Sequence, residues 1–132
     1  MKIEVHKRNV KESIDVIEEC IDKGVVDRQR TIGFHVSAAC IDLLEIYLHQ
    51  ENLIDPGLIL KHEWFKGKRR LQERLPFDFP RKMEIVQIIS YIEEQRNILC
   101  YGKPQKEESI GYILQEFHTL KKIFKELGID AE

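Results

Sequence analysis

Apolar residues recur at intervals of three and four along four separate segments of this chain, and this spacing constrains its fold more than any other feature. Because an α-helix turns by about 100° per residue, side chains three and four positions apart share one face. The four stripes are Val10, Ile14, Ile17 and Ile21; Ile32, Val36, Cys40, Leu43 and Tyr47; Ile85, Ile88, Ile89, Ile92 and Leu99; and Ile110, Ile113, Phe117, Leu120, Phe124 and Leu127. We therefore predict long helices over about residues 5–23, 28–51, 80–101 and 107–127.

Glycine or proline follows every one of these segments, as is typical of helix ends. The residues are Gly24, Pro56 and Gly57, Gly102 and Pro104, and Gly128. Within the sequence PFDFP, Asp78 is predicted to be the N-cap of the third long helix, with Pro80 in its first turn. Residues 58–75 form a shorter element, and no segment has the pattern of a strand. The sequence predicts an all-α fold in one domain spanning residues 1–132: an antiparallel four-helix bundle with a short additional helical segment between its second and third long helices.

Composition narrows the class of protein. Hydrophobic residues make up 42% of the chain and charged residues 33%, a balance that suits a folded helical protein and argues against disorder. The N-terminal sequence MKIEVHKRNVKESID is too polar for the apolar region of a signal peptide, and no membrane span is predicted. We therefore expect a cytoplasmic protein.

Metal and cofactor signatures are not found in the sequence. Cys20, Cys40 and Cys100 are odd in number and lie inside helical patterns without zinc spacing, so we expect reduced, mostly buried thiols. The five histidines form no metal-binding motif. Glu45 and His49, four residues apart, are the nearest approach to a ligand pair, and we expect them to be a surface contact. The sequence predicts neither a metal nor a cofactor.

Basic residues are concentrated between positions 61 and 74. Six of them (Lys61, Lys66, Lys68, Arg69, Arg70 and Arg74) stand against Glu63 and Glu73, a balance of +4 in a chain of net charge −2. Cations bind phosphates, and interleaved aromatic rings stack on bases in single-stranded nucleic-acid sites. A candidate nucleic-acid-binding site therefore comprises Lys61, Trp64, Lys66, Lys68, Arg69 and Arg70. The alternative is that Trp64 and Phe65 anchor a short helix to the core while the charges are solvated.

Arg96 lies within the apolar stripe of the third long helix. A guanidinium stays charged at any ordinary pH, so burying it without a partner costs several kcal/mol. We expect Arg96 to need an anion: a carboxylate of a neighbouring helix such as Asp42 or Glu45, a carboxylate of a second subunit, or a phosphate. Asn97 follows it directly, and Tyr101 lies about one turn further on, near the helix end.

The segment EEQRNILCYG, which contains these three residues, resembles the signature region of the HEPN superfamily. The second helix, GFHVSAACIDLLEIYL, is similar to the alanine-containing second helix of that family, and the order of helices is compatible over nearly the whole chain. The family pattern is an Arg, a polar residue, and then a His four to six residues beyond the Arg. Arg96 and Asn97 match, whereas Tyr101 stands where the His is expected. The resemblance implies a small all-α bundle, often dimeric and often found in toxin and antiviral RNases.

In that family the Arg holds the scissile phosphate and the His performs acid–base catalysis across a dimer interface. A phenol with an ordinary pKa near 10 is a weak base at neutral pH, so Tyr101 replaces the His poorly. The first hypothesis is therefore a homodimer that binds RNA or nucleotide phosphate through Arg96 and is catalytically weak or inactive. Two alternatives remain open: a metal-independent endoribonuclease of a toxin–antitoxin or defence system that uses Arg96, Asn97 and Tyr101, and a purely structural or partner-binding dimer. The resemblance also implies a nucleotidyltransferase-type or antitoxin protein as partner.

Overall fold

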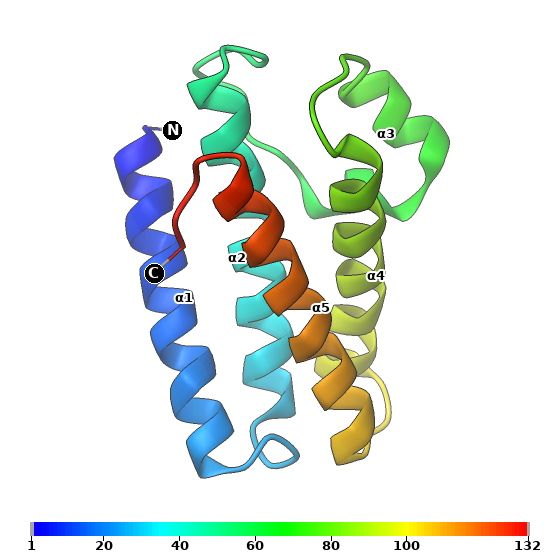
Figure 1. Ribbon diagram of the computed structural model, residues 1–132. Helices are drawn as coiled ribbons and strands as arrows, with labels where there is room; N and C mark the ends of the chain where they lie inside the picture. The colour runs from blue at the N-terminus through cyan, green and yellow to red at the C-terminus, as the bar shows by residue number, and fades with distance from the viewer. Residues whose placement is uncertain (1, 132) are drawn as a thin grey trace.

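The chain is all-helical in the computed structural model, which describes residues 2–131 (Figure 1). The elements are α1 (Ile3–Lys23), α2 (Gln29–Gln50), the short 3₁₀ helix η1 (His62–Lys66), α3 (Lys68–Arg74), α4 (Lys82–Tyr101) and α5 (Glu107–Glu126). No strand occurs in the described range. The predicted all-α class is confirmed, and the short element between the second and third long helices consists of η1 and α3.

The helix α2 forms the centre of the core. It packs along α1 on one side and contacts α4 and α5 on the other, while η1 packs against α4 (Figure 1). Its burial on several sides removes the amphipathic pattern that a surface helix shows. By length and composition alone α2 would also fit a membrane span, but 72% of its most apolar window is buried inside the fold, as in the core helix of a water-soluble protein.

Two predicted details are wrong. Ile21 was expected in the buried stripe of α1 but is 47% exposed, because Cys20 takes the inward position in the last turn. Asp78 is not the N-cap of α4: its carboxylate accepts a hydrogen bond from the backbone N–H of Phe79, and the helix begins only at Lys82. The residue before α4 is Arg81, with φ of 61° and with its guanidinium bonded to carboxylates of α4 and α5.

The side chain of Gln29 joins the α4–α5 connection to the start of α2 by two hydrogen bonds. Its amide Nε2 donates to the carbonyl oxygen of Gln105 at 3.2 Å, and its Oε1 accepts from the backbone N–H of the same residue at 2.8 Å. Gln29 is itself buried. One side-chain amide therefore satisfies both backbone groups of Gln105, as a neighbouring strand would.

The three cysteines are free thiols. Cys20 and Cys40 are buried and Cys100 is half-buried, in agreement with the predicted reduced, mostly buried thiols. Burial raises the pKa of the Cys40 thiol well above its usual value, with the Glu93 carboxylate adding to the shift. Such a thiol is a weak nucleophile, so Cys40 is a packing residue of the core.

Candidate functional site

The start of α2 and the end of α4 approach closely at Gly33. A Cβ atom at this position would lie 2.9 Å from the Cβ of Leu99, so only glycine fits the present spacing. Beside this contact, the thiol of Cys100 donates to the carbonyl oxygen of Arg30 at 3.6 Å. Gly33 thereby brings the Arg96 segment of α4 against the first turns of α2, a contact that no sequence pattern predicts.

Arg96 has no anionic partner within the described part of the chain. Its guanidinium carbon lies 5.9 Å from the centroid of the Phe34 ring, and its Nε atom is buried without a hydrogen-bond partner. The alternative of an internal pair with Asp42 or Glu45 is not found, because both carboxylates contact His6 instead. The anion that a half-buried arginine requires is therefore not supplied by residues 2–131.

A surface hollow of about 370 Å³ lies beside Phe34, the ring that the Arg96 guanidinium contacts. Its lining consists of Arg30, Thr31, Phe34, His35, Cys100 and Tyr101. The ring of Phe34 is 51% exposed and that of Tyr101 is 74% exposed, although large apolar side chains are usually covered. We call Arg30, Phe34, His35, Arg96 and Tyr101 the Arg96 surface. It combines two guanidinium groups, two exposed aromatic rings and one imidazole. The predicted Asn97 lies next to Arg96 on α4 and is half-buried.

His35 is one of three residues of this surface, with Arg30 and Phe34, that the sequence pattern did not predict. Its ring packs edge-on against Phe34, with centroids 5.2 Å apart, and its Nδ1 lies 3.3 Å from the Ser13 hydroxyl oxygen. Burial lowers the pKa of His35, and the nearby Glu12 carboxylate only partly opposes this shift. The imidazole is therefore neutral at neutral pH. No local signal marks His35, because it reaches the site only through the packing of α2 against α4.

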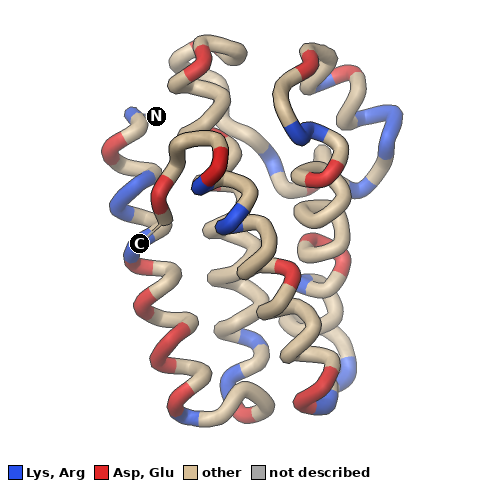
Figure 2. Tube along the Cα trace, viewed as in Figure 1, with Lys and Arg blue, Asp and Glu red and all other residues tan. Residues whose placement is uncertain are grey.

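The basic segment has an exposed and a buried part. The cations Lys61, Lys66, Lys68, Arg69 and Arg70 are exposed, and Figure 2 shows the concentration of basic residues around α3. Trp64, by contrast, is only 5% exposed, Phe65 is buried beside it, and the guanidinium of Arg74 lies 5.4 Å from the Trp64 ring. Trp64 is therefore not available to stack on a base. Its burial agrees instead with the alternative that Trp64 and Phe65 anchor this segment to the core.

A buried polar network joins η1 to α4. The Ser37 hydroxyl donates to Oε1 of Glu93 at 2.5 Å, and Nδ1 of His62 lies 2.6 Å from the same oxygen. Glu93 is 2% exposed, so these bonds provide the partners that its carboxylate needs. Because Glu93 lies one helical turn before Arg96, the network positions the basic segment against the same helix that carries the arginine.

A second polar cluster lies between α1 and α2. Nδ1 of His6 is 2.7 Å from Oδ1 of Asp42, and its Nε2 is 3.3 Å from Oε2 of Glu45. Burial raises the pKa values of Asp42 and Glu45 and lowers that of His49. The expectation that Glu45 and His49 form a surface contact is wrong, because Glu45 is only 2% exposed. The missed signal is the spacing of positions 42, 45 and 49, which share one face of α2, together with a histidine on the buried face of α1.

Comparisons of this chain with known protein families, with curated proteins and with solved structures found no match.

Proposed function

We propose that the Arg96 surface binds a phosphate group of RNA or of a nucleotide. The observation that carries the proposal is the unpartnered, buried Nε of Arg96, whose guanidinium contacts Phe34 at the wall of an exposed hollow. A planar guanidinium donates two parallel hydrogen bonds to phosphate, which would satisfy this atom and neutralise the charge. A lysine in this place would supply only a point charge.

The aromatic rings favour a nucleotide over a simple anion. Phe34, which contacts Arg96, and Tyr101 are exposed at the same hollow, and aromatic side chains beside cations are the usual means of holding unpaired bases. Arg30 adds a second cation at the rim of the same hollow. The exposed cations of the basic segment supply further phosphate contacts for a chain that extends beyond one nucleotide.

The resemblance to the HEPN superfamily agrees with this proposal, and we infer from it two finer features of architecture. The first is an antiparallel arrangement of the four long helices, which the alternating direction of α1, α2, α4 and α5 supports (Figure 1). The second is a homodimer in which a second copy packs at the edge of the Arg96 surface and leaves the exposed Phe34 and Tyr101 open to the nucleotide. A nucleotidyltransferase-type or antitoxin protein as the partner on this face is the alternative to a second copy.

The test is a titration of labelled short single-stranded RNA, and of a nucleotide, with wild type, Arg96→Ala and Arg96→Lys. We expect Arg96→Ala to weaken binding by about 5- to 150-fold, as loss of a specific contact worth about 1–3 kcal/mol implies, and Arg96→Lys to recover little. The matched control is Arg8→Ala, which removes an exposed arginine from α1. Melting curves separate function from scaffold: a wild type that binds no RNA, together with an Arg96→Ala variant that melts far below it, contradicts the proposal.

The position of His35 favours a second candidate function, a metal-independent endoribonuclease. The hollow that contains Tyr101 also contains this imidazole, which is a suitable base at neutral pH when uncharged. His35→Gln is expected to abolish cleavage while leaving RNA binding intact. Tyr101→Phe tests the phenol in the same assay, and Tyr101→His restores the family's histidine position. If only Tyr101→His cleaves RNA, the wild type is a binding protein and the endoribonuclease candidate is wrong.

A further inference from the structure

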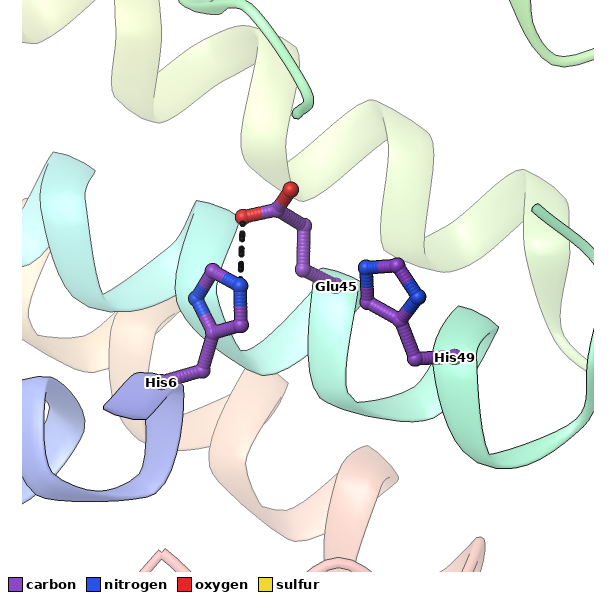
Figure 3. Close-up of side chains that lie close together, drawn as sticks. All are labelled: His6, Glu45 and His49. Atoms are coloured by element: carbon purple, nitrogen blue, oxygen red, sulfur yellow. Dashed lines mark ion pairs between the residues drawn. The ribbon is translucent and has the colours of Figure 1, made fainter. Parts of the chain in front are cut away.

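Three potential metal ligands meet between α1 and α2, away from the Arg96 surface. His6 belongs to the second turn of α1, and Glu45 and His49 come from successive turns near the end of α2 (Figure 3). One ligand atom from each of the three residues lies within 4.8 Å of the other two. Tyr101, in contrast, ends α4 at the opposite end of the fold (Figure 1).

Both imidazoles direct a bare nitrogen into this cluster. His6 Nε2 and His49 Nε2 are buried and have no hydrogen-bond partner within residues 2–131. His6 as a whole is only 1% exposed. Its Nε2 lies 3.3 Å from Oε2 of Glu45, yet this contact lacks the angles of a hydrogen bond. Two buried nitrogens without partners beside a carboxylate are costly unless something else occupies the space between them.

The outer contacts orient these groups as ligands. Asp42 Oδ1 lies 2.7 Å from Nδ1 of His6, so the ring proton belongs on Nδ1 and the lone pair on Nε2. His49 is hydrogen-bonded to the backbone of Leu58, and the backbone N–H of Leu60 donates to Oε1 of Glu45 at 2.9 Å. An acceptor behind each ligating imidazole and a hydrogen-bond donor to the ligating carboxylate are the usual outer shell of a protein metal site.

One of the ligand separations and the donor types fit a first-row divalent cation, and the three ligand atoms, which lie within 4.8 Å of one another, must draw closer to bind it. Zinc bonds of about 2.0–2.1 Å to nitrogen and oxygen place the ligands of a tetrahedral site about 3.3–3.4 Å apart. The separation of His6 Nε2 and Glu45 Oε2 already has this value. Two imidazoles and one carboxylate are a donor set that suits zinc and its first-row neighbours better than calcium or magnesium. A hollow of about 390 Å³, lined by His49, by Pro56 and by residues 2–4 of the chain, opens beside His49.

We propose that His6, Glu45 and His49 bind a divalent transition-metal ion of the zinc type, with Asp42 positioning His6. Three protein ligands leave a fourth position for water or another oxygen ligand on the side of the hollow. The ion joins the start of α1 to the end of α2, so binding also stabilises the contact between these two helices. This site is independent of the proposed RNA-binding surface.

The test uses tag-free protein that has been stripped of metal by a chelator and then titrated with Zn²⁺ and with Co²⁺. We expect one ion per chain, visible absorption bands of four-coordinate Co²⁺, and a higher melting temperature with Zn²⁺. Asp42→Asn removes an outer-shell partner and should weaken Zn²⁺ binding by about 10- to 100-fold. His49→Ala removes a ligand and should weaken Zn²⁺ binding by more than that. His118→Ala is the matched control, because His118 is exposed on α5.

Two results overturn the proposal: a wild-type protein that binds neither ion, or a folded His49→Ala variant that binds Zn²⁺ like the wild type. If His49→Ala does not fold, imidazole nitrogen NMR spectra of the wild type decide instead. Zn²⁺ must then shift the signals of His6 and His49 and leave those of His35 and His118 in place. Shifts at His35 or His118 alone refute the site.

Discussion

Replacing Gly33 by alanine probes the close contact that joins α2 to α4. The new Cβ would lie 2.9 Å from the Cβ and 3.3 Å from the Cδ1 of Leu99. Ordinary carbon–carbon contacts are about 3.5–4.0 Å, so the two helices must move apart by several tenths of an ångström. Because Phe34 follows Gly33 and Arg96 lies on the same helix as Leu99, the movement reaches the Arg96 surface.

The expected change in the free energy of unfolding has two parts of opposite sign. Alanine stabilises a helix interior by about 1 kcal/mol relative to glycine. Inserting a methyl group into a close-packed contact costs about 1–3 kcal/mol. We therefore expect Gly33→Ala to destabilise the protein by about 0–2 kcal/mol, and to weaken RNA binding because Phe34 and Arg96 are displaced.

Gly111→Ala is a closely matched control. Gly33 and Gly111 are each the fifth residue of their helix, but an added Cβ at Gly111 meets nothing within 4 Å. The control should therefore show only the propensity gain of about 1 kcal/mol. Denaturant unfolding of the three proteins measures the difference between the two variants, which we expect to be about 1–3 kcal/mol. A Gly33→Ala protein as stable as Gly111→Ala would refute the close contact.

Three further predictions concern the core, the pH dependence and the assembly. Phe117→Ala and Leu120→Ala each remove a buried side chain of α5 and should cost about 2–5 kcal/mol in denaturant unfolding, whereas losses well below 1 kcal/mol at both sites would show that this face is not the core. Because burial lowers the pKa of His35, the unfolded chain binds more protons than the folded one near this pKa. The free energy of unfolding should therefore be highest above the ordinary pKa of 6.5 and fall as the pH drops below it. His35→Gln should flatten this part of the stability–pH curve, and an unchanged slope would contradict the lowered pKa of His35. Sedimentation should find a dimer at micromolar concentration, and a monomer alone would contradict the proposed assembly.

Helices were predictable from this sequence because the signal is local. The apolar spacing and the glycines after each stripe located all four long helices, and their ends differ by at most about two residues from the structure. The N-cap of α4 was predicted wrongly, because Arg81 takes that position in a left-handed conformation and is held by contacts with Glu84 and Glu126. The partner on α5 is 45 residues away in sequence, so no local rule identifies it.

The candidate sites depended on contacts between helices, which the sequence shows poorly. Arg96 was identified because a cation inside an apolar stripe is a local anomaly. His35 and Phe34 were not, since they join the site only through the approach of α2 to α4 at Gly33. His6 was missed for the same reason: its partners are 36 and 39 residues away, on the next helix.

The two hydrogen bonds between the Gln29 side chain and the Gln105 backbone allow local opening of the fold near the Arg96 surface to be measured. The backbone N–H of Gln105 is held by a single buried side chain and not by a helix. Its hydrogen can exchange with solvent only when the start of α2 separates from the α4–α5 connection. The exchange rate of the Gln105 amide therefore measures how often the start of α2 separates from the α4–α5 connection. Gln29→Glu loses the donor to the carbonyl of Gln105 and should accelerate this exchange. Distant amides of α5 should keep their rates.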